Sequence, residues 1–551
     1  MSTGSSISCR SRMAYGGVDI ALLCLVVLYV VSAVANGRPV SWTIMSGALP
    51  YILLYAAARL CFCLADRWLQ IIAYAVLCLW TVYESALGLS QLLGFAVSGH
   101  AGFPMTGTFF NPGPFGGLVA SGMSCAAVYL FRYRGLLSGK VRSEGSLAGY
   151  AMLVLSTVTV IAGILVLPAS MSRAGWVGLC TALAIYVYRE TSALNWMKHH
   201  RWLTAAVCAV CIALAAGAFL LKRDSALGRL HIWEMELRAI SESPVIGYGP
   251  GLAMGAYGHA QEEYFAGRER PEQRVRVAGC PEYAFNEYLK TGMETGVAGL
   301  AISVLAVFMA VAGLLRKGSV LGYAMIAFAV YSFFSYPLSI PSTACLAVLL
   351  LAASGKECRS ASGTSLWTVT SSALLAACVL TAQSRELRKE AEKEYASVRQ
   401  WVGMELYEDA AEELAPLYGE LQHDAGYLYD YGYSLYRSGE YVKGIEVLTR
   451  GAEISSDPMF RNITGRCLEA LGDCDGAEKE YLTAHYMVPC RLYPLTLLMD
   501  MYISSGRTGD AVRTGETILA MPVNERHPAM SKMKRETEEK LVSLKNYGAD
   551  N

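Results

Sequence analysis

Arg173 is a single cation in a turn of small residues. It stands in the segment PASMSRAGWVGL, residues 168–179, between two apolar runs. A guanidinium in this setting can hold a phosphate group through two parallel hydrogen bonds. The alternative interpretation is an interfacial arginine whose apolar stem packs along the membrane while its charged end reaches water.

Two other short segments carry polar residues that could act chemically. Glu84 lies near the end of an apolar run, where an ionisable side chain is a candidate functional group, although a carboxylate at a membrane rim would give the same pattern. Asn111 belongs to GTFFNPGPFGG, residues 107–117, and its Asn-Pro-Gly-Pro sequence favours a rigid turn. This segment could also simply begin a helix with proline in the first turn.

The longest polar segment in the first part of the chain covers residues 222–290. Apolar residues recur at helical spacing near its start, which predicts an amphipathic helix with Arg229, Glu236 and Arg238 on its polar faces. The glycines at 247–251 form G-x-G-x-G, a spacing found in nucleotide-binding loops. We exclude that function because no predicted strand precedes them and the expected topology places them outside the cell membrane.

The elements that must position these residues are apolar helices. The chain of 551 residues is 54% hydrophobic and 17% charged, which excludes one ordinary soluble domain. The composition and the long apolar runs predict an all-α fold, with a polytopic membrane bundle of about eleven spans, because each run can cross about 30 Å of hydrocarbon. The runs cover residues 18–35, 42–64, 68–88, 113–131, 149–167, 174–188, 203–221, 293–315, 319–336, 340–354 and 364–383.

The distribution of lysine and arginine predicts the orientation of this bundle. Basic residues recur in alternate short loops, and cytoplasmic loops of membrane proteins are enriched in lysine and arginine. We therefore expect a cytoplasmic N-terminus, with residues 89–112, the turn at Arg173 and the segment 222–290 outside. The C-terminal part would emerge there too. Residues 33–35 form an A-x-A sequence that a signal peptidase could cleave without changing this orientation.

The charge balance divides the chain near residue 384. Residues 1–383 contain 26 Lys and Arg against 17 Asp and Glu, whereas residues 384–551 contain 20 against 29. We therefore expect a transmembrane domain over 1–383 and a second domain over 384–551. The basic residues are scattered through short loops, so nothing points to nucleic acid.

The second domain repeats with a period of 33 or 34 residues. Leu406, Gly439, Gly472 and Gly506 each precede a helical pattern, and a small residue follows five positions later at 411, 444, 477 and 511. This period resembles the tetratricopeptide repeat, whose helix pairs stack into a solenoid. The solenoid could be a spacer, but its concave surface favours a partner protein or an acceptor.

The cysteines do not predict a metal site. Ten of the sixteen lie in apolar runs, where a thiol behaves as a small hydrophobic group. Cys61 and Cys63 are two apart and Cys208 and Cys211 three apart, but no second Cys or His pair faces either of them at zinc spacing. We expect neither metal nor cofactor. Cys467, Cys474 and Cys490 could form one disulfide if the second domain lies outside the membrane, or could remain free thiols.

Five motifs in this order resemble the O-antigen ligase and polymerase superfamily of bacterial envelope glycosyltransferases. The resemblance covers roughly residues 80–335. The motifs are GTFFNPGP at 107–114, SRAGW at 172–176, GRLHIW at 228–233, PVIGYG at 244–249, and FNEYL followed by ETGVAGL within 285–300.

The resemblance implies a donor glycan on undecaprenyl pyrophosphate in the outer leaflet and its transfer to an acceptor without metal or nucleotide. Arg173 and Arg229 match the motif arginines of the family and are the expected catalytic groups that hold the pyrophosphate. The predicted substrate-binding residues lie in or near the same motifs. They are Glu84, Asn111, His231, Arg238, Asn286 and Tyr288.

The general base is a separate question because many family members have histidine at the position of Phe285. A carboxylate beside arginines would suit proton abstraction only if burial raised its pKa. We expect the base to be Glu287 or His259, although both could be solvated loop residues. The outer-side groups available are His100, His231, His259, Glu282, Glu287 and Glu294.

The resemblance favours a multi-pass protein of the bacterial inner membrane that ligates a glycan to lipid A core. The acceptor could instead be another glycan, as in an O-antigen polymerase, or a protein. A repeat domain of this size tilts the choice towards a bulky or protein acceptor. The alternatives from other classes are a transporter, which would need paired charges within its spans, and a membrane scaffold that recruits partners through its repeats.

Overall fold

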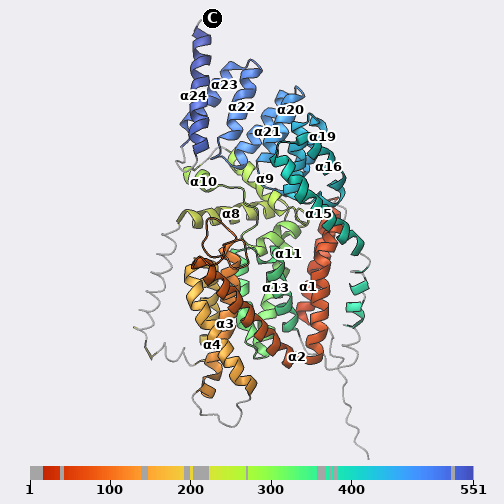
Figure 1. Ribbon diagram of the computed structural model, residues 1–551, viewed down its shortest axis with the longest axis vertical. Helices are drawn as coiled ribbons and strands as arrows, with labels where there is room; N and C mark the ends of the chain where they lie inside the picture. Colours follow the sequence, from red (N-terminus) through yellow and green to blue (C-terminus); the bar gives the residue numbers. More distant parts are fainter. Residues whose placement is uncertain are drawn as a thin grey trace, which may run out of the picture.

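The computed structural model describes residues 16–37, 42–137, 147–191, 199–200, 202, 223–267, 271–355, 368–372, 374–376, 379, 382–522 and 528–549. All regular secondary structure among these residues is helical, which confirms the predicted all-α class. Figure 1 shows a bundle of helices with a second group of shorter helices above it, and the two are separated by helix α8.

Most of the predicted spans appear as helices of the bundle. Helix α2 covers two of them, because it contains a kink at Ala65, where φ is −144°. The predicted span at 203–221 lies outside the described residues, and the span at 364–383 is described only at 368–372, 374–376, 379 and 382–383. The bundle helices are α1 (Gly17–Ala35), α2 (Trp42–Leu92), α3 (Pro112–Leu137), α4 (Leu147–Ala169), α5 (Arg173–Glu190), α11 (Glu287–Arg316), α12 (Leu321–Phe334) and α13 (Pro341–Ser354).

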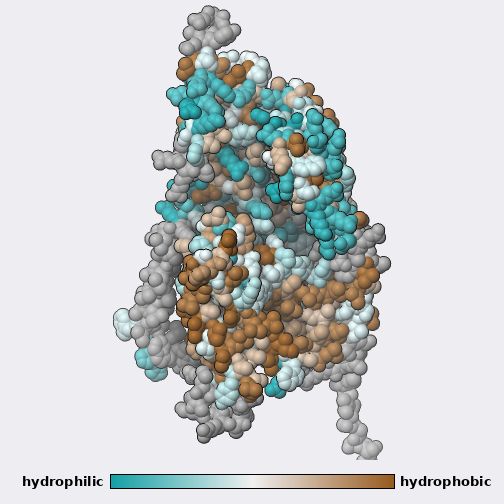
Figure 2. Space-filling model, in the orientation of Figure 1, coloured by the Kyte–Doolittle hydropathy of each residue, from teal (hydrophilic) through white to brown (hydrophobic). Residues whose placement is uncertain are grey.

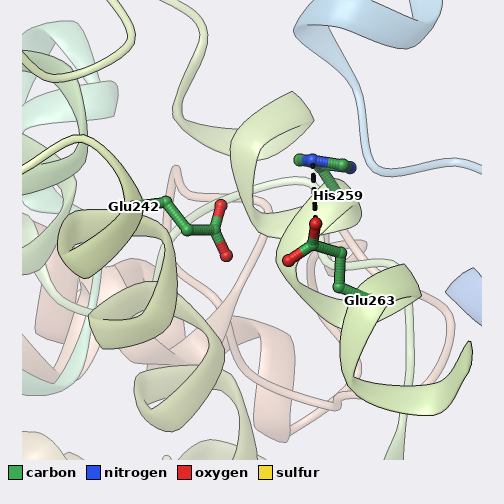
Figure 3. A group of neighbouring side chains, drawn as sticks. All are labelled: Glu242, His259 and Glu263. Carbon is green, nitrogen blue, oxygen red and sulfur yellow. Dashed lines mark ion pairs between the residues drawn. The ribbon is translucent and has the colours of Figure 1, made fainter. Parts of the chain in front are cut away.

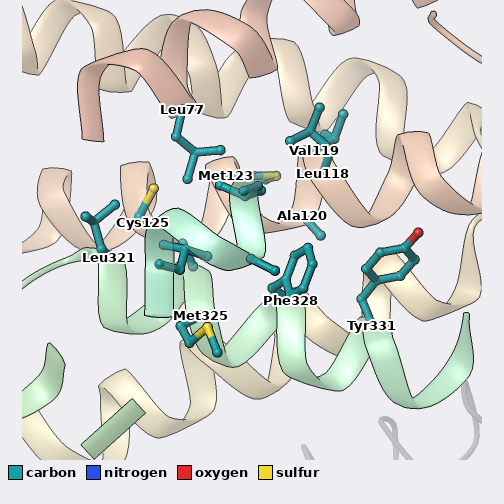
Figure 4. Close-up of a cluster of buried hydrophobic side chains, with 14 of the residues drawn as sticks. Leu77, Leu118, Val119, Ala120, Met123, Cys125, Leu321, Met325, Phe328 and Tyr331 are labelled. Carbon is teal, nitrogen blue, oxygen red and sulfur yellow. The ribbon is translucent and has the colours of Figure 1, made fainter. Parts of the chain in front are cut away.

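Helix α3 forms the centre of the bundle. Its side chains interdigitate with those of α2 and α12 in the cluster drawn in Figure 4, where Leu118, Val119 and Ala120 are almost completely buried. Glycines let its neighbours approach closely. A Cβ added at Gly117 would lie 2.6 Å from the ring of Tyr331, so no larger residue fits there without displacing α12.

The outer surface of the bundle is apolar. Many large hydrophobic side chains are exposed on the bundle, among them Leu23, Leu64 and Phe308. Figure 2 shows one face of the molecule, with a hydrophobic (brown) zone below a hydrophilic (teal) upper part. Five of the described helices, α1, α2, α3, α4 and α11, are long and apolar enough to cross a membrane. An apolar surface of this extent marks a membrane-embedded region.

Three helices of the polar segment lie on one end of the bundle. They are α8 (Arg223–Glu242), α9 (Ala253–Ala266) and α10 (Glu272–Val277). Helix α8 is the amphipathic helix predicted from sequence: Met235 and Ile240 are buried, and Figure 1 shows it lying across the bundle. It packs against both α11 and α9.

We call the C-terminal helices the helical stack, because from α18 onward each helix packs on the next one in sequence, while α16 packs on both α15 and α18. Gly439, Gly472 and Gly506 turn between them with φ of 86°, 83° and 75°, a conformation that favours glycine. Their identity as tetratricopeptide repeats stays a prediction. The helices are α15 (Ala382–Gly403), α16 (Tyr407–Leu414), α17 (Tyr418–Leu421), α18 (Ala425–Arg437), α19 (Tyr441–Ile454), α20 (Met459–Ala470), α21 (Cys474–Met487), α22 (Tyr493–Ser504), α23 (Thr508–Ala520) and α24 (Pro528–Ala549).

Candidate functional site

Arg173 is held by close packing between α3 and the turn that precedes α5. It is the first residue of α5, and the Ser172 hydroxyl caps that helix by accepting a hydrogen bond from the Gly175 backbone N–H at 3.4 Å. A Cβ added at Gly116 of α3 would lie 2.2 Å from the Cβ of Ser172. The glycine therefore permits the contact that fixes the start of α5, and with it the backbone of Arg173.

The tertiary structure brings Arg173 to the start of α8, close to Arg229. The Arg173 guanidinium donates to the Ser225 hydroxyl at 2.9 Å. Burial, followed by the positive charge of Arg173, lowers the pKa of Arg229. Among the described residues no carboxylate forms a salt bridge with either arginine, so their charges repel without local compensation. Such a pair is suited to bind an anion with several oxygens.

Aromatic rings form one wall beside this arginine pair. The Arg229 guanidinium lies over the Phe285 ring, 5.4 Å from its centre. Tyr336, which follows α12, stacks on Tyr283 with 4.5 Å between ring centres and lies 5.6 Å from Phe285. The sequence analysis missed Tyr283 and Tyr336, because aromatic residues in an apolar chain give no signal until the fold gathers them.

The three predicted residues at the start of α11 lie next to Phe285. The Asn286 side chain caps the helix by accepting from the backbone N–H groups of Tyr288 and Leu289. Glu287 is buried and accepts a hydrogen bond from the backbone N–H of Leu338 at 2.6 Å. The Tyr288 hydroxyl donates to the Ala329 carbonyl at 3.1 Å. All three have structural partners here, and their roles towards a substrate stay predictions.

Glu236 is the residue that the sequence placed wrongly. We expected it on a polar face of the amphipathic helix, but its side chain is completely buried, because α11 covers that side of α8. Neither of its oxygens has a hydrogen-bond partner within the described residues, and the same holds for Nδ2 of Asn286. Burial, and then the neighbouring Glu287, raises the pKa of Glu236 well above the usual value for glutamate.

We predict that Glu236 makes the fold sensitive to pH. Its folded-state pKa is raised above the unfolded value, so the folded protein binds more protons and stability falls as pH rises towards the folded-state pKa. Compared with Glu236→Gln, the wild-type chain should lose at least about 1 kcal/mol between pH 5 and pH 8. Thermal unfolding in detergent across this range measures the difference, and parallel curves would contradict the prediction.

Glu84 anchors the loop that precedes α3. Its carboxylate accepts hydrogen bonds from the backbone N–H of Thr108 at 2.9 Å, from the Thr108 hydroxyl at 2.6 Å and from the Trp80 indole at 3.2 Å. Asn111 forms the predicted turn, because its side-chain oxygen accepts from the Gly113 N–H at 2.9 Å. Both residues hold the start of α3, and their contact with a substrate stays a prediction.

His231 and Arg238 face α9. His231 is completely buried, and its Nε2 lies 3.0 Å from the side-chain oxygen of Gln261. Burial lowers the pKa of this histidine. Arg238 lies over the ring of Tyr264 at 4.8 Å and is 3.9 Å from Glu234. The structure therefore joins Arg229 to Arg173 and directs these two neighbours on α8 to a different surface.

His259 lies on the exposed side of α9. Its ring nitrogens are 3.3 Å from Glu262 and 3.7 Å from Glu263. Figure 3 shows the carboxylate of Glu242 facing His259 and Glu263. The hydrogen bond with Glu262 raises the pKa of His259. The ligand atoms of Glu242, His259 and Glu263 lie within 4.8 Å of one another, so they could hold a metal ion, and all three are exposed. The expected absence of a metal stays a prediction.

The glycine-rich loop at 247–251 packs into a break in α11. Helix α11 leaves helical geometry at Gly296, where φ is 76°, and the Tyr248 N–H donates to the Met293 carbonyl at 2.8 Å. A Cβ added at Gly247 would lie 2.5 Å from the backbone of Glu294. These glycines allow backbone to approach backbone, which agrees with our exclusion of a nucleotide loop.

Comparison with known proteins supports the resemblance. Residues 157–304 match the model of the O-antigen ligase family. This stretch contains both arginines of the pair, the buried Glu236 and the start of α11. This match relates residues 157–304 of the chain to the O-antigen ligase-related superfamily.

The matched region covers only part of the chain. A similar protein is the exopolysaccharide production protein ExoQ of Rhizobium meliloti strain 1021, which is 24% identical over 198 residues, or 35% of this chain. The chain spans 42% of the length of this curated relative. The family resemblance and the apolar helices together indicate a membrane protein. Glu84, Asn111 and the helical stack lie outside the matched family region.

Proposed function

We propose that this protein transfers a glycan from undecaprenyl pyrophosphate to an acceptor on the outer face of the bacterial inner membrane. The observation that carries the proposal is the proximity of Arg173 and Arg229, without a carboxylate in a salt bridge to either among the described residues. A pyrophosphate bound there would supply the missing negative charge. The apolar surface of the bundle would accommodate the polyprenyl chain.

The arginine pair would act on the leaving group. An acceptor hydroxyl attacks the anomeric carbon of the donor sugar, the bond from that carbon to the phosphate oxygen breaks, and undecaprenyl pyrophosphate departs. Guanidinium groups stabilise the charge that develops on the departing phosphate in the transition state. The rings of Phe285, Tyr283 and Tyr336 provide flat apolar surface beside them.

The proton of the acceptor hydroxyl must pass to a base. Glu287 is buried at the start of α11, two residues after the ring that Arg229 covers, whereas His259 is paired with carboxylates on α9. This difference favours Glu287 over His259 as the base. Neither step requires a metal or a nucleotide.

We place the segment 222–290 and the helical stack on the periplasmic side, with the N-terminus in the cytoplasm. The stack would then stand above the outer leaflet, where it could hold a protein partner or a bulky acceptor. Lipid A core is the acceptor in our first version of the proposal. The name of the relative, exopolysaccharide production protein, supports an alternative proposal in which the acceptor is a growing glycan.

The acceptor is tested by deleting the gene in its host and restoring it as wild type or as Arg173→Ala. Loss of capped lipopolysaccharide supports ligation, a ladder reduced to single repeats supports polymerisation, and loss of glycoprotein bands supports a protein acceptor. We expect the Arg173→Ala strain to match the deletion strain. Unchanged profiles in that strain would refute the role of the arginine in binding pyrophosphate.

A further inference from the structure

Helix α9 forms a middle layer between α8 and the helical stack. It packs against α8 on one side and against α19 and α21 on the other, and Figure 1 shows it between them. A Cβ added at Gly255 would lie 1.9 Å from the carbonyl oxygen of Glu453, so the two backbones touch. We call the contact of α9 and residues 278–281 with the helical stack the seam.

Gln261 lies at the centre of the seam and is almost completely buried. Its side-chain oxygen is 3.0 Å from Nε2 of His231 and accepts from the Tyr257 hydroxyl at 2.6 Å. Its amide nitrogen donates to the Gly279 carbonyl at 3.0 Å and to the Met487 carbonyl of α21. A glutamine side chain offers two acceptor sites and two donors, and here all four are used.

This arrangement fixes the stack in one position. An apolar seam could slide with little change in energy, because hydrophobic contact is not directional. A buried amide that lost any one of its partners would leave an unsatisfied polar group, at a cost of about 1–3 kcal/mol. Gln261 therefore ties four segments together in a single register: α8, α9, the loop at 278–281 and α21.

Two connections lead from Gln261 to the arginine pair. The first runs through His231, which is two residues from Arg229 on the rigid helix α8. The second runs through Gly279, in the segment that continues to Phe285, the ring under the Arg229 guanidinium. The seam is reinforced nearby, because Ser456 donates to the Pro281 carbonyl at 2.8 Å and Thr483 donates to Glu262 at 3.1 Å.

We propose that Gln261 is a positioning residue: by joining the helical stack to α8 and to the segment before Phe285, it sets the position of Arg229 relative to Arg173. The stack is then a working part of the transfer site in addition to any partner it binds. This inference rests on the proposed function for its activity measurement, but the role of Gln261 in holding the seam can be measured separately.

The first experiment compares Gln261→Ala with wild type, using the full chain in detergent. We expect faster hydrogen exchange at residues 278–281 and in α9, at least about tenfold weaker binding of inorganic pyrophosphate by calorimetry, and a lower kcat with little change in acceptor KM. Gln422→Ala is the matched control, because the hydrogen bond of Gln422 within the described residues is a local one, to the Gly419 carbonyl at 3.2 Å. It should leave all three measurements unchanged.

The second experiment restores the seam by a covalent bond. A Cβ added at Gly258 would lie 3.6 Å from the Cβ of Ser456, within the range of about 3.5–4.5 Å that disulfides require. Gly258→Cys and Ser456→Cys are introduced into Gln261→Ala, with Cys280→Ser and Cys490→Ser so that these seam thiols cannot pair. Oxidation should recover pyrophosphate binding and kcat, and reduction should abolish the recovery.

The outcomes separate the two ideas. Unchanged hydrogen exchange in Gln261→Ala refutes the claim that Gln261 holds the seam. Faster exchange with unchanged pyrophosphate binding and kcat refutes positioning, as does failure of the oxidised disulfide to restore them. If the wild-type chain binds no pyrophosphate, or Arg229→Ala keeps full activity, the proposed function fails, and with it the link to the arginines, while the exchange data still decide whether Gln261 holds the seam.

Discussion

Replacing Arg229 by alanine is expected to lower glycan transfer by about 100-fold or more, with kcat carrying most of the loss. The reason is that a charged donor aimed at a leaving group contributes most in the transition state, and removing one such donor typically costs 10²–10³ in rate. Arg229→Lys should recover part of the activity, because an ammonium keeps the charge but cannot form two parallel hydrogen bonds.

The pair should behave as one unit. Arg173→Ala is expected to have a similar effect, and the double variant should lose less than the product of the two single losses, because both residues act on one group. Transfer assays with purified protein and a lipid-linked donor measure these rates. Arg276→Ala is the matched control, since Arg276 is exposed and only pairs with Asp224 at 2.5 Å; it should stay within about twofold of wild type. Additive losses, or full activity in Arg229→Ala, would contradict shared binding of a pyrophosphate.

Replacing Asp19 by asparagine is expected to destabilise the bundle by about 3–5 kcal/mol, the usual cost of removing one charge of a buried ion pair. Asp19 of α1 and Arg59 of α2 are buried, with 3.3 Å between Oδ1 and Nε. The same carboxylate accepts from the Tyr55 hydroxyl and from the Gly16 N–H, both at 2.6 Å. The variant would leave the Arg59 charge without this counterion in an apolar bundle.

Thermal unfolding of the detergent-purified chain measures this effect. Arg59→Leu should be destabilised to a similar degree, and the double variant Asp19→Leu with Arg59→Leu should be more stable than either single variant, because it removes both charges of the pair from the bundle. Breaking the exposed Lys545–Glu516 pair by Lys545→Ala is the control and should cost less than about 1 kcal/mol. A loss that small for Asp19→Asn would show that the pair contributes little.

The parts of the fold that were predictable from sequence are those set by local patterns. Continuous apolar runs became the helices of the bundle, because backbone groups in hydrocarbon must be satisfied within the helix. Apolar spacing gave α8, and Gly439, Gly472 and Gly506 marked turns where φ must be positive. The expected span at 203–221 and part of 364–383 lie outside the described residues, so the number of spans stays a prediction.

The site was only partly predictable, for a physical reason. The arginines stood out because a charged side chain among apolar residues is costly to bury and is therefore a candidate functional group. The burial of Glu236 could not be foreseen, since a carboxylate on an amphipathic helix normally faces water and only the approach of α11 removes the water. Gln261 gave no signal at all, because its four partners come from four segments of the chain.

The sequence by itself therefore determined that this is an apolar helical protein, which charged residues stand alone among apolar ones and which motifs resemble the O-antigen ligase superfamily. These properties depend on residue type and short spacing. Only the tertiary structure decided that Arg173 of α5 lies close to Arg229 of α8 and that the Arg229 guanidinium lies over Phe285. It also decided that Gln261 bonds the helical stack to α8 and to the segment before Phe285. Contacts between distant segments depend on how helices pack, and one sequence records that packing only indirectly.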